Sequence, residues 1–176
     1  MTMTARIAVV ALAVGILAGD AVARERGELT APRPASTQEA GVVAVLVDQA
    51  TQQPVLVLEG KRDKRQLTMA IGLAEATGIA LPLQGVTPPR PLTHDLFLTM
   101  FGRLKVTMTR VVVTDFRDDV YYASVFLQTG AGEIVLDSRP SDAIALAVRA
   151  KVPVLVEDKV FEKGGAPVVA PRRPHI

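Results

Sequence analysis

The strongest constraint on the fold is an internal similarity between two stretches of the chain. A shift of 67 residues places Val45 on Val112, Leu67 on Ile134 and Glu75 on Asp142 without a gap. Each stretch has the predicted order strand, strand, strand, helix. Because one three-stranded unit buries too little apolar surface alone, we expect the two units to share a core. The predicted class is α+β, with duplicated strand-strand-strand-helix units and a mainly antiparallel sheet.

The individual elements follow from apolar runs separated by polar turns. An extra connecting helix is expected over 90–104, where Thr93 is a suitable N-cap and Leu96, Phe97, Met100, Phe101 and Leu104 share one face. The expected strands cover 42–47, 54–58, 66–70, 105–114, 120–128, 133–137 and 152–157, and the other expected helices cover 71–81 and 140–150.

The start of the chain has the pattern of a secretory signal peptide over residues 1–23. Arg6 precedes an apolar run over 7–18, and Ala21-Val22-Ala23 supplies an A-x-A cleavage site. The run is too short to span a bilayer comfortably, although an uncleaved anchor is the alternative. Cleavage would give an exported protein, periplasmic or extracellular, without stable membrane association.

The rest of the chain divides by composition into three parts. Residues 24–40 are polar, contain Pro32 and Pro34 and show no periodicity, so we expect a flexible leader. Residues 41–163 carry the periodic pattern and form the predicted domain. Residues 164–176 are rich in Gly and Pro and form a predicted flexible tail.

Composition excludes several classes of site. The chain has no Cys, which excludes disulfides, Cys-ligated zinc, iron–sulfur clusters and thiol nucleophiles. It lacks Trp and is only 4% aromatic, which disfavours a broad base-stacking platform. Its 20 basic and 18 acidic residues leave a net charge of +2, unlike a protein that wraps DNA. No dinucleotide or phosphate-loop motif occurs, so no organic cofactor is expected.

Two short clusters combine basic, hydroxyl and acidic side chains at a predicted helix start, over 90–95 and 137–142. Free backbone N–H groups at helix starts bind phosphate readily. An arginine in either cluster could add a bidentate clamp. The candidate phosphate-binding residues are Arg90, Thr93, Ser138, Arg139 and Ser141.

His94 is the histidine inside the predicted domain, and it could act as a general acid or base near neutral pH. Asp137, Asp142 and Glu75 are candidate ligands for Mg²⁺ or Mn²⁺, with Asp95 as an alternative. The candidate catalytic residues are therefore His94, Asp95, Asp137 and Asp142.

The same residues also have a purely structural interpretation. Thr93 and Ser138 could only cap helices, and Asp95 and Asp142 could only be favourable charges in a first helical turn. Arg139 could form a structural ion pair. The basic turn over 61–65 could be solvated or could steer a polyanion.

Three stretches resemble the bifunctional nuclease domain family: IGLAEATGIAL (71–81), RPLTHDLF (90–97) and LDSRPSDAIALAVRAKVPVLVEDKVFEK (136–163). The resemblance covers about residues 41–163. It implies an α+β fold with a duplicated unit, homo-oligomers, and cleavage of DNA and RNA. A signal-like start departs from a family associated with intracellular proteins. The matching motif positions are Glu75, Arg90, Pro91, Thr93, His94, Asp95, Asp137, Ser138, Arg139, Pro140, Ser141 and Asp142.

The sequence therefore predicts a nuclease that hydrolyses phosphodiester bonds of DNA and RNA without strong sequence preference. Two alternatives stay open: a non-catalytic oligomeric module that binds a ligand or a partner, and a phosphodiesterase for small molecules. Metal-dependent turnover would separate a nuclease from a binding module.

Overall fold

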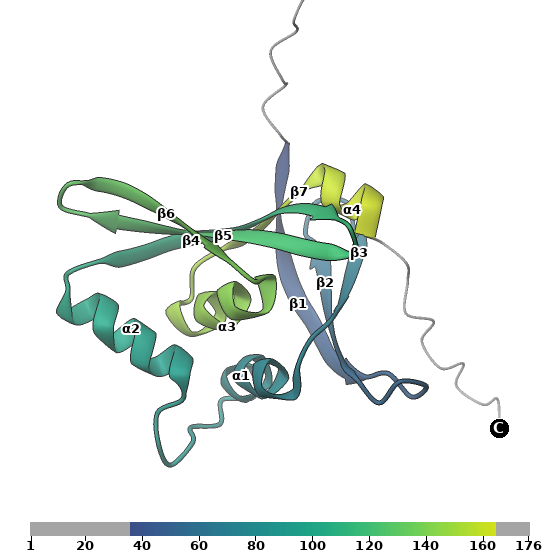
Figure 1. The fold of residues 1–176 in the computed structure, drawn as a ribbon, viewed down its shortest axis with the longest axis horizontal. Coiled ribbons are helices and arrows are strands. Elements are labelled where there is room, and N and C mark those ends of the chain that lie inside the picture. Colours follow the sequence, from purple (N-terminus) through teal and green to yellow (C-terminus); the bar gives the residue numbers. More distant parts are fainter. Residues whose placement is uncertain (1–35, 165–176) are drawn as a thin grey trace, which may run out of the picture. The chain divides into compact units, whose positions relative to one another are not determined.

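The computed structural model of this protein describes residues 36–164, which form one seven-stranded sheet and four helices (Figure 1). No helix in this range is long and apolar enough to cross a membrane. The strands are β1 (Thr37–Val47), β2 (Pro54–Gly60), β3 (Gln66–Ala70), β4 (Thr107–Arg117), β5 (Val120–Thr129), β6 (Gly132–Ser138) and β7 (Val154–Glu157). The helices are α1 (Leu73–Leu83), α2 (Thr93–Arg103), α3 (Pro140–Ala150) and α4 (Asp158–Gly164).

The strand order in the sheet is β3-β2-β1-β7-β4-β5-β6. Neighbouring strands are antiparallel except β4 and β7, which are parallel. The short strand β7 joins two three-stranded arms, and Figure 1 shows these arms running in different directions. The α+β class with a mostly antiparallel sheet is therefore confirmed.

The order strand, strand, strand, helix occurs twice along the chain, as β1-β2-β3-α1 and as β4-β5-β6-α3. Helix α3 covers the expected residues 140–150. Strand β1 begins at Thr37, inside the stretch expected to be a leader, because its first residues pair with β7. Residues 1–35 and 165–176, with the predicted signal peptide, most of the leader and the tail, lie outside the described range.

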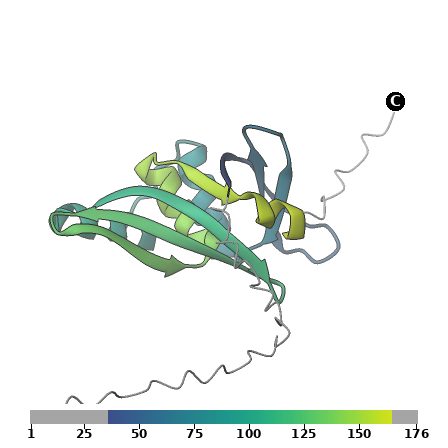
Figure 2. The same ribbon diagram turned by 90° about the horizontal axis from the view of Figure 1, so that it is seen from above.

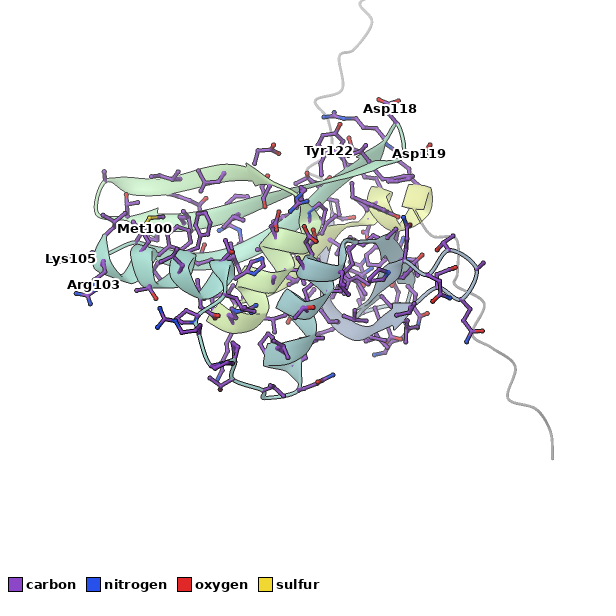
Figure 3. All side chains as sticks on the ribbon, turned by 60° about the horizontal axis from the view of Figure 1, so that its bottom comes forward. Met100, Arg103, Lys105, Asp118, Asp119 and Tyr122 are labelled. Carbon is purple, nitrogen blue, oxygen red and sulfur yellow. The ribbon has the colours of Figure 1, made fainter. Side chains whose placement is uncertain are left out.

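Strand β4 extends beyond its predicted end. Phe116 pairs with Tyr121 and Arg117 with Val120, which leaves Asp118 and Asp119 as a two-residue turn. Both aspartates have positive φ, 52° and 58°, as a type I′ hairpin turn requires. Figure 3 shows this acidic turn at the upper edge of the fold, far from Arg103 and Lys105 at its left edge.

The core is built around α3. Ala143, Ile144, Ala145 and Ala147 are completely buried, so this helix has little exposed surface along its middle. It packs against β4 and β5 and contacts both α1 and α2. The strands of the second arm form a curved layer beside the helices (Figure 2). Small alanine side chains allow this close approach of helix backbone to the surrounding elements.

An ion-pair network around Asp158 fastens the start of β1 and the β2–β3 turn to α4. Arg62 and Arg65 donate to its carboxylate at 2.7 and 2.6 Å, and the Ser36 hydroxyl donates as well. The basic turn over 61–65 thus has two of its arginines engaged internally. Hydrogen bonds from Ser36 and Arg62 lower the pKa of Asp158 to about 2.

We expect Asp158→Asn to make the protein less stable at pH 7 and to flatten its acid denaturation. A carboxyl whose pKa is about 2 when folded and about 3.9 when unfolded stabilises the fold above pH 4. That contribution is lost as the pH falls from 4 to 2. Urea midpoints at pH 7, 4 and 2.5 measure it, with Asp118→Asn as the control at an exposed acid. Parallel pH profiles for Asp158→Asn and the wild type would contradict the assignment.

Candidate functional site

Arg139 binds two carboxylates that are far apart in the sequence. It is the N-cap of α3, with extended φ and ψ of −65° and 140°. Its Nε donates to Asp142 Oδ2 at 2.6 Å, and its Nη2 donates to Glu75 Oε1 at 2.7 Å. The side chain of Arg139 is 67% exposed, whereas that of Glu75 is only 17% exposed. The internal similarity paired Glu75 with Asp142, and the fold brings both to one guanidinium.

His94 lies beside this cluster, in the first turn of α2. Its Nε2 is 3.6 Å from Asp142 Oδ1, and its side chain is 13% exposed. Burial and the nearby Arg149 lower the pKa of His94, although Asp142 and Asp95 act in the opposite direction. The imidazole is therefore neutral at pH 7, so it can accept a proton.

Helix α2 begins one residue earlier than a Thr93 N-cap predicts. Leu92 is the N-cap, and Thr93 is the first helical residue. The Leu92 N–H donates to Asp95 Oδ2 at 2.8 Å, which satisfies one backbone group and sets the start of the helix. Thr93 itself is exposed and makes no side-chain capping bond.

Arg149 binds Asp95 and holds the three helices together. Its Nε donates to Asp95 Oδ1 at 2.8 Å, and its Nη1 donates to the backbone oxygens of Gly78 and Ala145. Burial alone would raise the pKa of Asp95, but the bonds from Leu92 and Arg149 hold it below its usual value. Asp95 is therefore ionised and paired with Arg149 rather than with Arg139.

Sequence reasoning missed Arg149, whose side chain is only 7% exposed. The spacing in the sequence could have pointed to this residue. Arg149 follows Asp142 by two helical turns, and residues at that spacing lie on the same face of a helix. A buried cation needs an anionic partner, and Asp95 is that partner.

Two glycines leave room for the functional side chains. A Cβ on Gly78 of α1 would lie 2.9 Å from His94 Cε1, so the imidazole packs directly on the α1 backbone. A Cβ on Gly72, the N-cap of α1, would collide with the Glu75 carboxylate. The two glycines let these side chains approach the backbone closely, and neither glycine has a left-handed backbone conformation.

Two clefts share His94, Arg139 and Asp142 in their walls. The larger, of about 690 Å³, continues along α1 past Glu75 and Thr77. The smaller, of about 430 Å³, lies between α2 and the sheet. The candidate side chains thus form a wall that the two clefts share.

The remaining predicted residues take different positions. Ser141 is buried, and the Ser138 hydroxyl donates to the Arg139 carbonyl oxygen. Arg90 is exposed and has no ion-pair partner within residues 36–164. Asp137 borders the smaller cleft, but β6 alternation directs its side chain away from the face that carries Leu136.

The fold does not assemble the expected metal ligands into one group. Across residues 36–164, no three Asp, Glu or His side chains are close enough to hold a metal ion. Glu75 and Asp142 share Arg139 instead, and Asp137 lies on the edge strand. Mg²⁺ or Mn²⁺ binding stays a prediction.

An exposed guanidinium at the N-terminus of α3 lies beside a histidine whose pKa is lowered, and both side chains line the two clefts. Comparisons with known proteins identify the family. A model of the bifunctional nuclease domain matches residues 56–169. An uncharacterized protein of Mycobacterium tuberculosis is 39% identical over 127 residues, which cover 72% of this chain and 76% of that protein.

Two relatives from a plant are named as nucleases. Bifunctional nuclease 1 of Oryza sativa subsp. japonica is 32% identical over 114 residues, covering 62% of this chain and 34% of that protein. Bifunctional nuclease 2 of the same plant is 29% identical over 133 residues, covering 72% and 40%. The chain belongs to the bifunctional nuclease domain family.

We expect Gly78→Ala to displace the His94 ring. Alanine normally stabilises a helix interior by about 1 kcal/mol relative to glycine, but here its methyl group meets the imidazole. An NMR titration should therefore show a changed His94 pKa, together with a smaller gain in stability than the helix propensity predicts. Gly102→Ala in α2 is the matched control, since nothing lies within 4 Å of its added methyl. Identical His94 titrations in both variants would refute the close contact.

Proposed function

We propose that this protein hydrolyses phosphodiester bonds of DNA and RNA without strong sequence preference. One observation carries the proposal: His94, Asp142 and Arg139 converge at the shared wall of two clefts, and Glu75 pairs with Arg139 there. Phosphodiester hydrolysis needs an activated water and stabilisation of the charge that develops on the phosphate. The family supports a hydrolase of this kind, and the plant relatives are named as nucleases.

Arg139 is the group that would hold the phosphate. Its Nε and Nη2 bind carboxylates, while its Nη1 has no hydrogen bond within residues 36–164. A guanidinium has five N–H donors, so phosphate oxygens can bind the outer edge without breaking both ion pairs. The free N–H groups at the start of α3 add to the same electrostatic field.

His94 is the proposed general base. A neutral imidazole next to the bound phosphate can take a proton from the attacking water. The imidazolium that forms lies 3.6 Å from Asp142 Oδ1, and this carboxylate stabilises its charge. Burial keeps the imidazole neutral until a proton is transferred.

A divalent cation stays part of the proposal. Arg139 faces two carboxylates, so the three side chains together carry one net negative charge before an anionic phosphate enters. Mg²⁺ or Mn²⁺ at Glu75 and Asp142 would offset this charge. We assign no reaction step to the ion, and we propose no organic cofactor.

The proposed location of the protein is outside the cytoplasm. We infer that residues 1–23 direct the protein out of the cytoplasm, where it would act as a periplasmic or extracellular enzyme that stays off the membrane. The sequence pattern of that segment supports this proposal.

A homo-oligomer is the second proposal, and it also fits the alternative of a non-catalytic assembly module. Ile134, Val135 and Leu136 on edge strand β6 are each more than 40% exposed, as are Leu96 on α2 and Leu104 at its C-cap. Exposed apolar surface of this extent is typical of an interface.

The activity test uses the purified full chain with fluorescently labelled single-stranded DNA and RNA. Each reaction contains Mg²⁺, Mn²⁺ or EDTA. We expect cleavage of both polymers, reduced at least about 100-fold by His94→Ala and by Asp142→Asn. Asp118→Asn is the control at an exposed acid in the β4–β5 turn. Equal cleavage by all variants would indicate a contaminant, and absent cleavage would favour the binding module.

We also expect a pH profile for kcat/KM that falls on the acid side with an apparent pKa below 6.5. The base must be neutral, and burial with Arg149 makes protonation harder, so activity persists to lower pH than for an ordinary histidine. Asp142 raises the pKa of His94. The residual activity of Asp142→Asn should therefore fall on the acid side with a still lower apparent pKa than that of the wild type. An apparent pKa that moves upward would contradict the coupling between Asp142 and His94.

A further inference from the structure

We propose that the smaller cleft, between α2 and β6, binds one unstacked nucleobase of the strand whose phosphate lies at Arg139. This inference rests on the proposed function and names the form of its substrate: a single strand, read through the face of a base. The argument depends on the walls of the cleft, on its position beside Arg139 and on the accessibility of Phe97.

The walls of this cleft are suited to a flat, apolar ring. Phe97 and Phe101 of α2 form one side, and Val125, Leu136 and Leu146 form the rest of the apolar surface. The volume of about 430 Å³ is in the range of pockets for small-molecule ligands, about 300–1,000 Å³. Bases stack on aromatic side chains in proteins that bind single strands.

Phe97 is both accessible and fixed. Its side chain is 43% exposed, so a ligand can reach the ring, whereas Phe101 behind it is only 9% exposed. The two rings meet edge to face, with centroids 6.2 Å apart. Phe97 therefore packs on the buried Phe101 while a large part of its own side chain stays accessible.

The layout of the cleft is also complementary to a nucleotide. Its apolar part ends at a rim that includes Arg139 and Thr93, next to His94 and Asp142. A nucleotide has an apolar ring at one end and an anionic phosphate at the other. Arg139 is 67% exposed, and its Nη1 donates to no group within residues 36–164, so it can bind that phosphate.

This arrangement predicts that the enzyme prefers single-stranded substrates and that it discriminates little between the four bases. A base in a duplex is paired and stacked, so it must be unstacked before it can enter, at a cost of a few kcal/mol. Apolar walls contact the face of a base, which every base has, and not its hydrogen-bonding edge. Hence the site would accept the four bases, and both DNA and RNA, with little discrimination.

The test compares two labelled single strands of equal length and charge. One is oligo(dT), and the other carries tetrahydrofuran abasic residues at its centre, which keep the phosphates but lack bases. We expect wild-type protein to cleave the oligo(dT) about tenfold faster, in kcat/KM, than the abasic strand, the size of one aromatic stacking contact. Fluorescence anisotropy should show the same preference in binding.

Phe97→Ala should remove this preference, lowering cleavage and binding of oligo(dT) to the level of the abasic strand. Phe97→Trp should retain it, because the ring is kept. Met100→Ala is the matched control, an equally exposed apolar side chain on the same helix that does not line the cleft. Circular dichroism and light scattering on each variant report the fold and the oligomeric state.

Each outcome decides the proposal. Equal wild-type cleavage of both strands, with equal binding, overturns the base pocket while leaving the nuclease intact. Absent cleavage with a binding preference that Phe97→Ala removes refutes the nuclease and retains the base pocket. If Phe97→Ala instead dissociates an oligomer and the preference for bases persists, the cleft is an interface between copies, and the base pocket is wrong.

Discussion

The burial of α3 is the interaction on which the rest of the structure depends. Its alanines let β4, β5, α1 and α2 pack closely on it, so a single helix positions the second arm of the sheet and two other helices. The N-terminal turn of α3 carries Arg139 and Asp142. Because these residues belong to a helix buried along its middle, their backbone has little freedom to move. The candidate site thus derives its rigidity from the core.

Arg149 connects that core to the chemistry of the site. It pairs with Asp95 and donates to the Gly78 carbonyl oxygen, and so fixes α2 and α1 against α3. The same positive charge helps to lower the pKa of His94, which lies between those helices. A residue with a structural task therefore also sets the protonation state of the proposed base. Replacing it would alter packing and electrostatics together.

Sequence reasoning predicted the local features of the site and missed its long-range ones. The residues 140–150 form the expected helix because propensity, an N-terminal proline and an apolar pattern agree over that stretch. The alignment of Glu75 with Asp142 singled out two acids that the fold brings to one guanidinium. From the sequence, Asp137 and Asp95 were equally good candidates. The fold places them differently: alternation along β6 directs Asp137 away from the cluster, and Arg149 pairs with Asp95.

By itself, the sequence determined the class of fold, most helices and strands, the motif residues and the family, because these depend on local periodicity, helix-end chemistry and linear motifs. Only the tertiary structure decided that Thr37 joins the sheet, that Arg139 bridges Glu75 and Asp142, and that Phe97 lines a cleft beside them. These features join residues that are distant in the chain. Their geometry follows from how elements pack around α3, and side-chain packing has no signature in a local pattern.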